Sequence, residues 1–258
     1  MRPLAELQPG GVRAVLADID ETLTTAGKLT AGAFAALERL HEAGKIVVPV
    51  TGRPAGWCDH IARMWPVDAV VGENGGFYFA YSEGKLHKRF LDDAPTRAQK
   101  RSRLDAVAKR ILAEVPGSAL AADQPYRETD LAIDYCEDVP PLPMEAAERI
   151  AALMKQAGLN AKISSIHVNG WFGGYDKLST SRLLFDERFG IDIEQSNRQI
   201  VFVGDSPNDA PTFAYFENSV GVANVRRFQG RLAAAPKYVT HAVAGAGFVE
   251  LVEYLLPS

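Results

Sequence analysis

Two aspartates separated by one residue follow a short apolar run near the start of the chain. Asp18 and Asp20 come directly after residues 14–17, which read Ala-Val-Leu-Ala. An apolar run of this length, preceded by Gly10 and Gly11, favours a buried parallel strand over a helix. Ligands of open α/β sheets bind beyond the carboxyl ends of the strands, so both carboxylates are expected to face such a crevice. A strand followed by an acidic turn gives the same pattern, so this motif alone does not decide the function.

Further polar loops follow apolar runs later in the chain. They contain Thr51 and Gly52 after residues 46–50, Asn74 after residues 69–71, and Asp205, Asn208 and Asp209 after residues 199–203. Amphipathic helical patterns separate these runs, as in βαβ units, which place the strand ends at one edge of a parallel sheet. We therefore expect the polar loops to meet at that edge.

The chemistry of such a meeting is constrained by charge. Four of the converging side chains are carboxylates, those of Asp18, Asp20, Asp205 and Asp209, and Lys177 is the one cation that the pattern places beside them. Like charges in a shielded crevice raise each other's pKa unless a cation is bound there. Mg²⁺ is the natural candidate, because it takes oxygen ligands and binds through a few carboxylates and a substrate phosphate.

Covalent phosphoryl transfer accounts for the remaining residue types. Asp18 would attack phosphorus, and Asp20, two residues further on and so on the same side of an extended strand, would protonate the leaving oxygen and then activate water. Thr51 and the following backbone amides could hold the phosphoryl oxygens, while Lys177 offsets their charge.

Between about residue 92 and residue 174 the pattern changes to helix, strand, strand, helix, strand, strand. Leu131, Ile133 and Tyr135 alternate with smaller or polar residues there, which predicts a sheet with one face on helices and one open face. The fold class predicted is therefore α/β, with a Rossmann-like parallel-sheet core and an inserted α+β cap. The expected boundaries are 1–84 for the first part of the core, 85–174 for the cap and 175–258 for the second part of the core.

Composition excludes several function classes. The formal net charge of −4 gives no general attraction to nucleic acid or to an anionic membrane surface. Cys58 and Cys136 are the two cysteines, without a metal-ligand spacing, which argues against a zinc site or a disulfide framework. No signal-like or membrane-spanning run is present in the sequence, so a cytoplasmic protein is expected. The oligomeric state is not predicted.

The sequence resembles the haloacid dehalogenase superfamily of phosphohydrolases, whose four motifs are matched in order. They are Asp18-Ile19-Asp20-Glu21-Thr22, Thr51-Gly52-Arg53, Lys177, and Gly204-Asp205-Ser206-Pro207-Asn208-Asp209. The resemblance implies that Asp18 is the nucleophile and Asp20 the general acid and base. It implies phosphate binding by Thr51, Gly52, Lys177 and Asn208. It also implies Mg²⁺ binding by Asp18, the Asp20 carbonyl and Asp205, with Asp209 supporting bound water. The placement of the insert is similar to the subclass IIB, or Cof-like, cap of sugar-phosphate phosphatases.

Two positions depart from the usual pattern of this family. Glu21 stands where Gly is common, which adds an acid at the rim that could disfavour highly anionic substrates. Ser206 and Pro207 could stiffen the turn of the fourth motif. Neither change removes a catalytic atom.

The function predicted is a Mg²⁺-dependent phosphomonoesterase that acts on a small phosphorylated metabolite, and a sugar phosphate is the expected class. A phosphomannomutase-like transferase and a non-catalytic phospho-ligand-binding protein are the alternatives. Asn74, Arg127 and His167 are candidate substrate contacts, although structural roles compete at Arg127 and His167. The expected partner is a small phosphomonoester, with no nucleic acid and no membrane.

Overall fold

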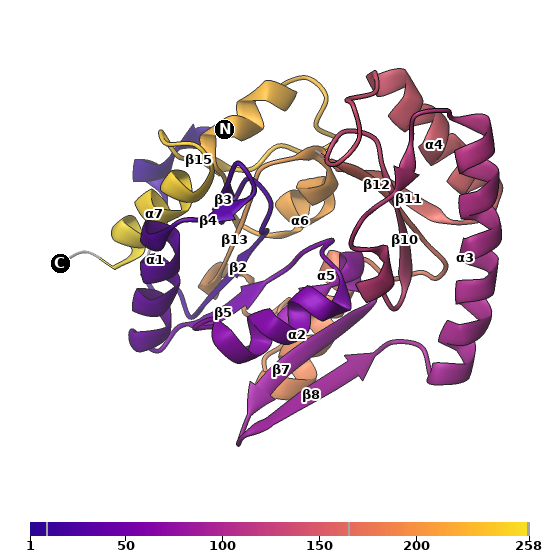
Figure 1. The fold of residues 1–258 in the computed structure, drawn as a ribbon. Helices are drawn as coiled ribbons and strands as arrows, with labels where there is room; N and C mark the ends of the chain where they lie inside the picture. The colour runs from indigo at the N-terminus through magenta and orange to yellow at the C-terminus, as the bar shows by residue number, and fades with distance from the viewer. Residues whose placement is uncertain (9, 165, 257–258) are drawn as a thin grey trace.

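The fold has a central parallel sheet between helices, with a second α/β unit inserted into it (Figure 1). The computed structural model describes residues 1–8, 10–164 and 166–256. No helix within these ranges is both long enough and apolar enough to cross a membrane. The predicted α/β fold class, a parallel-sheet core with an inserted cap, is confirmed.

The central sheet has six strands, and every neighbouring pair in it is parallel. In order across the sheet they are β1 (Arg2–Pro3), β15 (Tyr238–Val239), β14 (Asn218–Gly221), β13 (Ile200–Gly204), β2 (Ala14–Ala17) and β5 (Ile46–Pro49). Residues of β2 and β13 are buried throughout, which is why both read as continuous apolar runs rather than alternating ones. The edge strand β1 was not foreseen, because two residues carry no periodic signal.

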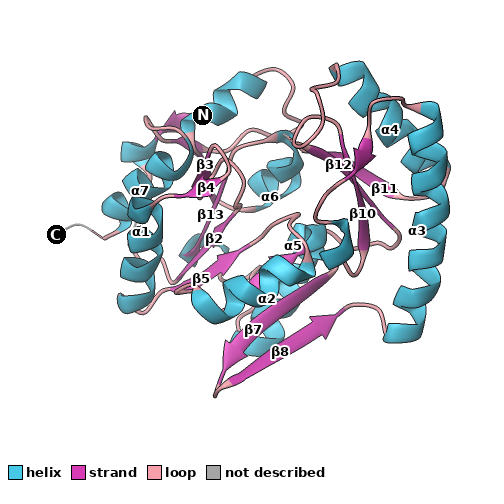
Figure 2. Ribbon diagram, in the orientation of Figure 1, coloured by secondary structure: helices cyan, strands magenta, loops and turns pink. Residues whose placement is uncertain are grey.

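Helices cover both faces of this sheet (Figure 2). One face packs against α1 (Ala31–Glu42), α2 (Ala55–Met64) and α7 (Ala244–Leu255), and the other against α5 (Lys177–Leu184) and α6 (Ala210–Tyr215). The side chain of Thr30 accepts the N–H of Ala33 and so caps α1, as its position before the helix predicts. These two apolar layers fix the strand ends that carry the polar loops.

A three-stranded antiparallel sheet links the core to the insert. It consists of β6 (Val70–Gly72), β7 (Phe77–Ser82) and β8 (Lys85–Phe90). An isolated parallel bridge between Val50 and Val71 joins β6 to the chain just after β5. The hairpin turn at Glu83 and Gly84 is where the sequence predicts it. The predicted cap boundary at residue 85 divides this hairpin. We propose instead that β7 and β8 both belong to the core and that the cap begins after residue 90.

The inserted unit, called the cap below, has the predicted order of helix, strand, strand, helix, strand, strand. Its elements are α3 (Ala94–Glu114), β9 (Ala119–Leu120), β10 (Asp130–Asp134), α4 (Met144–Gln156), β11 (Asn160–Ile163) and β12 (His167–Trp171). The strands form an antiparallel sheet in the order β11-β12-β10-β9, and apolar residues of α3 and α4 pack on one face of it (Figure 1).

The second face of the cap sheet differs from the open face that the alternation predicts. Asp130 and Asp134 are 0% and 1% exposed, although they alternate with the core-facing residues of β10. The reason is local pairing: Asp130 contacts Arg127, and Asp134 accepts the N–H groups of Cys136 and Glu137 in the following turn. Hydrogen-bonded acids can therefore occupy this face without reaching solvent.

Candidate active site

Asp18 lies at the carboxyl end of the central strand β2. Its N–H donates to the carbonyl of Val203 on β13, 2.9 Å away, which continues the sheet pairing by one residue. The side chain is 4% exposed, and its Oδ1 accepts a hydrogen bond from Lys177 Nζ at 2.7 Å. Lys177 is the first residue of α5, so strand β2 and helix α5 bring the predicted nucleophile and the predicted cation into contact.

Two further carboxylates complete an acidic cluster. One oxygen from each of Asp18, Asp205 and Asp209 lies within 4.8 Å of the others. Asp209 Oδ1 accepts from Lys177 at 3.0 Å, and its Oδ2 accepts the N–H of Asp205 at 3.1 Å. A Cβ on Gly204 would lie 2.5 Å from Asp209 Oδ2, so only glycine lets this loop close around the carboxylate. Both oxygens of Asp209 are thus engaged within the protein.

The electrostatics of the cluster indicate a missing positive charge. Burial, together with Asp209 and Asp20, raises the pKa of Asp18 to about 7, although Lys177 opposes the shift. Burial and two neighbouring acids, Asp18 and Asp209, raise the pKa of Asp205 to about 8. The two acids together hold the pKa of Lys177 above its usual value despite its burial. One lysine therefore does not compensate the cluster.

A divalent cation fits these residues. The available ligand atoms are carboxylate oxygens, which suit Mg²⁺, and a bound cation removes the repulsion that raises their pKa values. Asp18 and Asp205 have oxygens to offer, whereas Asp209 holds Lys177 and the loop amides. Asn224 Nδ2 donates to Asp205 Oδ2 at 2.9 Å and would orient this ligand. Sequence reasoning missed Asn224, which follows β14 without an acidic motif.

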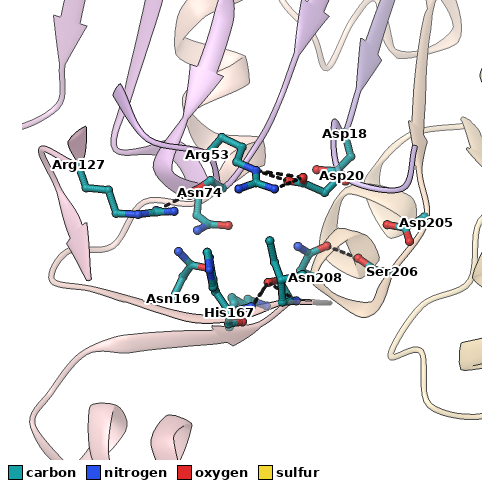
Figure 3. A pocket seen from close by; sticks show the side chains of 14 residues that line it. Asp18, Asp20, Arg53, Asn74, Arg127, His167, Asn169, Asp205, Ser206 and Asn208 are labelled. Atoms are coloured by element: carbon teal, nitrogen blue, oxygen red, sulfur yellow. Dashed lines mark hydrogen bonds and ion pairs between the residues drawn. The ribbon is translucent and has the colours of Figure 1, made fainter. Parts of the chain in front are cut away.

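Asp20 does not join this cluster. Its carboxylate accepts from Arg53 Nε at 3.0 Å and from Nη2 at 2.8 Å, in a two-pronged ion pair. Arg53 also stacks on Trp57 and lies 3.3 Å from Glu137 of the cap. Arg53 belongs to the second motif, but no role was predicted for it. In the structure its guanidinium group holds the carboxylate of Asp20, the predicted acid and base (Figure 3).

The predicted phosphate-binding residues Thr51, Gly52 and Asn208 lie in the loops that follow β5 and β13, the two strands that flank β2. Thr51 is fully buried, and its Oγ1 accepts the N–H of Arg53 at 3.0 Å. A Cβ on Gly52 would approach Asn74 Nδ2 to 3.2 Å, so a glycine keeps this loop open beside the amide. Asn208 Oδ1 accepts from the hydroxyl of Ser206 at 2.7 Å. Asn208 and Gly52 line one cavity together with Asp18.

The cap closes this cavity from the opposite side (Figure 3). The lining residues from the cap and its connections are Arg127, Lys162, Ser164, Ile166, His167 and Asn169. His167 Nε2 lies 2.8 Å from a carboxylate oxygen of Glu137, and this contact, with Arg53, holds the pKa of Glu137 well below its usual range. Lys162, Ser164 and Asn169 were missed, because the alternation that predicts an open cap face was recognised only in residues 131–136.

Arg127 lies in the cavity wall with its donors engaged. It donates to Asp123 at 2.8 Å, to Asp130 at 3.0 Å and to the Gly52 carbonyl at 2.9 Å. These contacts join the cap to the phosphate-binding loop. Its predicted contact with substrate remains a prediction, and its contacts within the protein support the structural role.

Glu21 has its carboxylate outside the cavity. Its Oε1 accepts the N–H of Gly27 at 3.4 Å, and its backbone has φ 55°, in the left-handed region. That conformation favours glycine and gives a physical reason for the glycine common at this position. The predicted repulsion of anionic substrates gains no support from this placement.

Comparison with known proteins gives one family and one fold. The model of the haloacid dehalogenase-like hydrolase family matches residues 15–98, and no curated protein matches the chain. A solved protein from Thermoplasma acidophilum has a TM-score of 0.71 at 18% identity, covering 95% of this chain and 98% of its own. A putative HAD/COF-like hydrolase from Plasmodium vivax has a TM-score of 0.70 at 18% identity, covering 97% and 98%. The sucrose-phosphatase from Synechocystis, solved with sucrose and phosphate, has a TM-score of 0.63 at 14% identity, covering 99% and 98%.

At these identities the solved structures establish the fold, which extends over the cap as well as the core. The family model covers the stretch that holds the first two motifs, and the structure brings the third and fourth motifs to the same sheet edge. The predicted resemblance to the haloacid dehalogenase-like hydrolases, and with it an enzyme of the hydrolase class, is confirmed by the family model over residues 15–98, and the solved structures share the fold of the whole chain.

Proposed function

We propose that the chain is a Mg²⁺-dependent phosphomonoesterase that acts on a small phosphorylated metabolite through a phosphoryl-aspartate at Asp18. The observation that carries the proposal is that two carboxylates, two residues apart in the sequence, lie in different surroundings. Asp18 is bound by Lys177 within the acidic cluster, while Asp20 is held apart from it by Arg53. Two acids in different environments suit two roles, nucleophile and proton carrier.

The roles of the residues follow from this geometry. Asp18 attacks phosphorus, and the leaving oxygen takes a proton from Asp20. Asp20 then removes a proton from the water that attacks phosphorus and releases Asp18. Lys177 offsets the charge that develops on the phosphoryl oxygens, and Thr51 and the loop amides position them. Bound Mg²⁺ would be held by Asp18 and Asp205 and would supply charge neutralisation at the phosphoryl group.

The size of the cavity requires movement of the cap. Its volume is about 30 Å³, far below the roughly 300 Å³ at which pockets for drug-sized ligands begin. A substrate can therefore enter only if the cap moves away from the core. Closure afterwards would exclude bulk water from the phosphoryl-aspartate.

A sugar phosphate is the first substrate class to test. Support comes from the cap, which the chain shares in fold with the sucrose-phosphatase from Synechocystis. The hydroxyl groups of a sugar or of a sugar acid would meet hydrogen-bonding side chains from the cap, among them Asn169 and Ser164.

The test is phosphate release from a panel of sugar phosphates and other small monoesters, with Mg²⁺ or with a chelator. We expect turnover that needs Mg²⁺ and falls by about 10⁴-fold or more in Asp18→Asn. Transfer of phosphate between positions of one sugar without release would indicate the mutase instead. Binding of monoesters without either reaction would indicate a non-catalytic binding protein.

A further inference from the structure

The cavity at Asp18 borders a second one between the cap and the core. The second cavity has a volume of about 40 Å³ and shares Asn74, Lys162 and Asn208 with the first. Lys177 and Trp171 also line it. A substrate that reaches from one cavity to the other must pass the three shared side chains, so these are placed to contact the part of the substrate next to the phosphoryl group.

Lys162 lies at this junction and has no partner in the part of the chain that the structure describes. It lies on β11, opposite Asn169 of β12 in the antiparallel register, and is half-buried. Its ammonium makes no ion pair or hydrogen bond with any residue in the ranges 1–8, 10–164 and 166–256.

The other cations that border the two cavities are all paired. Arg53 contacts Asp20, Arg127 contacts Asp130, and Lys177 contacts Asp18. Among the described residues that line these cavities, the charge of Lys162 is therefore the one left for a ligand.

Asn74 presents an unpartnered donor to the same space. The residue is 5% exposed, and its Nδ2 has no hydrogen-bond partner among the described residues. Its backbone is held by a hydrogen bond from its N–H to the Thr51 carbonyl, and it adopts φ 55°. Figure 3 shows its side chain directed into the cavity. Buried donors are nearly always satisfied, so an acceptor atom of a ligand is expected here.

We propose that Lys162 and Asn74 form a subsite for a carboxylate on the leaving group, so that the substrate is the phosphomonoester of a hydroxy acid. The inference rests on the proposed function and narrows its substrate class. A carboxylate can accept from both the ammonium and the amide, whereas a neutral hydroxyl would leave the charge of Lys162 uncompensated.

The phosphoryl group does not need Lys162. Lys177 Nζ already lies 2.7 Å from Asp18 Oδ1. The acidic cluster also offers carboxylate oxygens for a metal ion, which would further compensate the charge of the phosphoryl group. Glu21 does not oppose a second negative charge either, because its carboxylate is turned to Gly27.

The experiment compares ester pairs that differ only in a carboxylate against a hydroxymethyl group. The pairs are 2-phosphoglycolate with 2-hydroxyethyl phosphate, 3-phosphoglycerate with glycerol 1-phosphate, and 6-phosphogluconate with glucitol 6-phosphate. We expect kcat/KM of the native chain to favour at least one acid over its partner by about 10- to 100-fold, as a charge-assisted hydrogen bond allows. In Lys162→Met that ratio should fall to near one, and Lys162→Arg should restore part of it.

Lys155→Met is the matched control, because Lys155 is an exposed lysine of the cap helix α4 outside both cavities. It should leave the ratio unchanged. A native chain that treats acid and neutral esters alike would overturn the inference. So would Lys162→Met lowering both members of each pair equally, which would assign Lys162 to the phosphoryl group or to cap stability.

Calorimetric binding separates this inference from the proposed function. If no ester is hydrolysed, titration of Asp18→Asn with the same pairs still gives an answer. Tighter binding of an acid than of its neutral partner, lost on adding Lys162→Met, would support the subsite. The absence of hydrolysis would then contradict the proposed function alone. Equal binding of acid and neutral esters, or no binding of either, would contradict the subsite.

Discussion

The core edge of the site and the cap side of its cavity differ in how their charges are compensated. At the core edge, Lys177 contacts both Asp18 and Asp209, and the loop amides hold Asp209. On the cap side, Lys162 has no partner among the described residues. In the proposed function, the groups that carry out chemistry are thus fixed by each other before a substrate arrives, whereas Lys162, which we propose to recognise the substrate, is left to pair with it.

The two sides are also joined by polar links, besides the contact of Arg127 with the Gly52 carbonyl. Arg53 of the core lies between Asp20 and Glu137 of the cap, and Glu73 of the core accepts the N–H groups of Glu128 and Thr129 in the cap. The cap movement that we propose would break some of these contacts or rotate about them. The contacts therefore limit how far the cap can move relative to the catalytic loops.

The largest effect is expected from the core edge, in Lys177→Met. The substitution leaves two buried carboxylates without their shared cation and removes charge compensation at the phosphoryl group. We expect kcat to fall by about 10³-fold and the free energy of unfolding to fall by about 3–5 kcal/mol. Steady-state kinetics and urea unfolding measure both, with Lys155→Met as the control. A folded variant within tenfold of native kcat would show that the core edge is not organised around this lysine.

A second prediction concerns pH and metal at the same edge. The native pKa values of Asp18 and Asp205 are about 7 and about 8, above the ordinary 3.8. The metal-free native state therefore binds more protons than the unfolded state between about pH 4 and about pH 8, and stability falls as pH rises through this window.

We expect a loss on the order of a few kcal/mol over that window in chelator, and a much smaller loss with saturating Mg²⁺. Urea unfolding at several pH values, with chelator or with Mg²⁺, measures the difference. Asp205→Asn should flatten the profile in chelator. A native profile that rises with pH in chelator would contradict the raised pKa values.

Glu73→Gln tests the link between core and cap. The buried carboxylate of Glu73 accepts from the N–H groups of Ala55 and Glu128 and from the hydroxyl of Thr129, and an amide would place a donor against donors. We expect a loss of about 1–3 kcal/mol in unfolding free energy and faster hydrogen exchange at residues 128–130. Glu128→Gln, at an exposed neighbour, should change neither. Unchanged exchange in Glu73→Gln would mean that the cap is held elsewhere.

The smallest effect is expected in Glu21→Gly. Glycine relieves the left-handed backbone at φ 55° but gains freedom in the unfolded chain, so a net stabilisation of about 0.5–1 kcal/mol is expected. The kcat/KM for each ester should change by less than about twofold, because the Glu21 carboxylate lies outside the cavity. Glu83→Gly, at φ 53° in the hairpin turn, is the control for the stability gain. A large gain in activity with anionic esters would restore the role at the rim that the sequence suggested.

The core was predictable for a physical reason that does not extend to the cap. Parallel strands deliver their following loops to one edge, so Asp18, Thr51 and Asp205 could be grouped from apolar runs alone. Alternation in residues 131–136 predicted a cap sheet with one face away from the helices, but no such pattern was recognised in β11, and so Lys162 was not found.

The sequence also could not show which side chains pair with one another. Arg127 is paired with Asp123 and Asp130, four and three residues away, yet nothing in the spacing distinguishes this from a free cation. Arg53 and Asn224 act through contacts to Asp20 and Asp205, which only the three-dimensional arrangement reveals.

The central claim is that Asp18 carries the phosphoryl group during turnover. The most direct measurement is acid quenching of the Mg²⁺-loaded enzyme within a single turnover of its best ester, followed by peptide mapping by mass spectrometry. We predict a phosphoryl group on Asp18 that disappears as phosphate is released, and none in Asp18→Asn. Phosphorylation of another residue, or unimpaired Mg²⁺-dependent phosphate release by Asp18→Asn, would contradict the account.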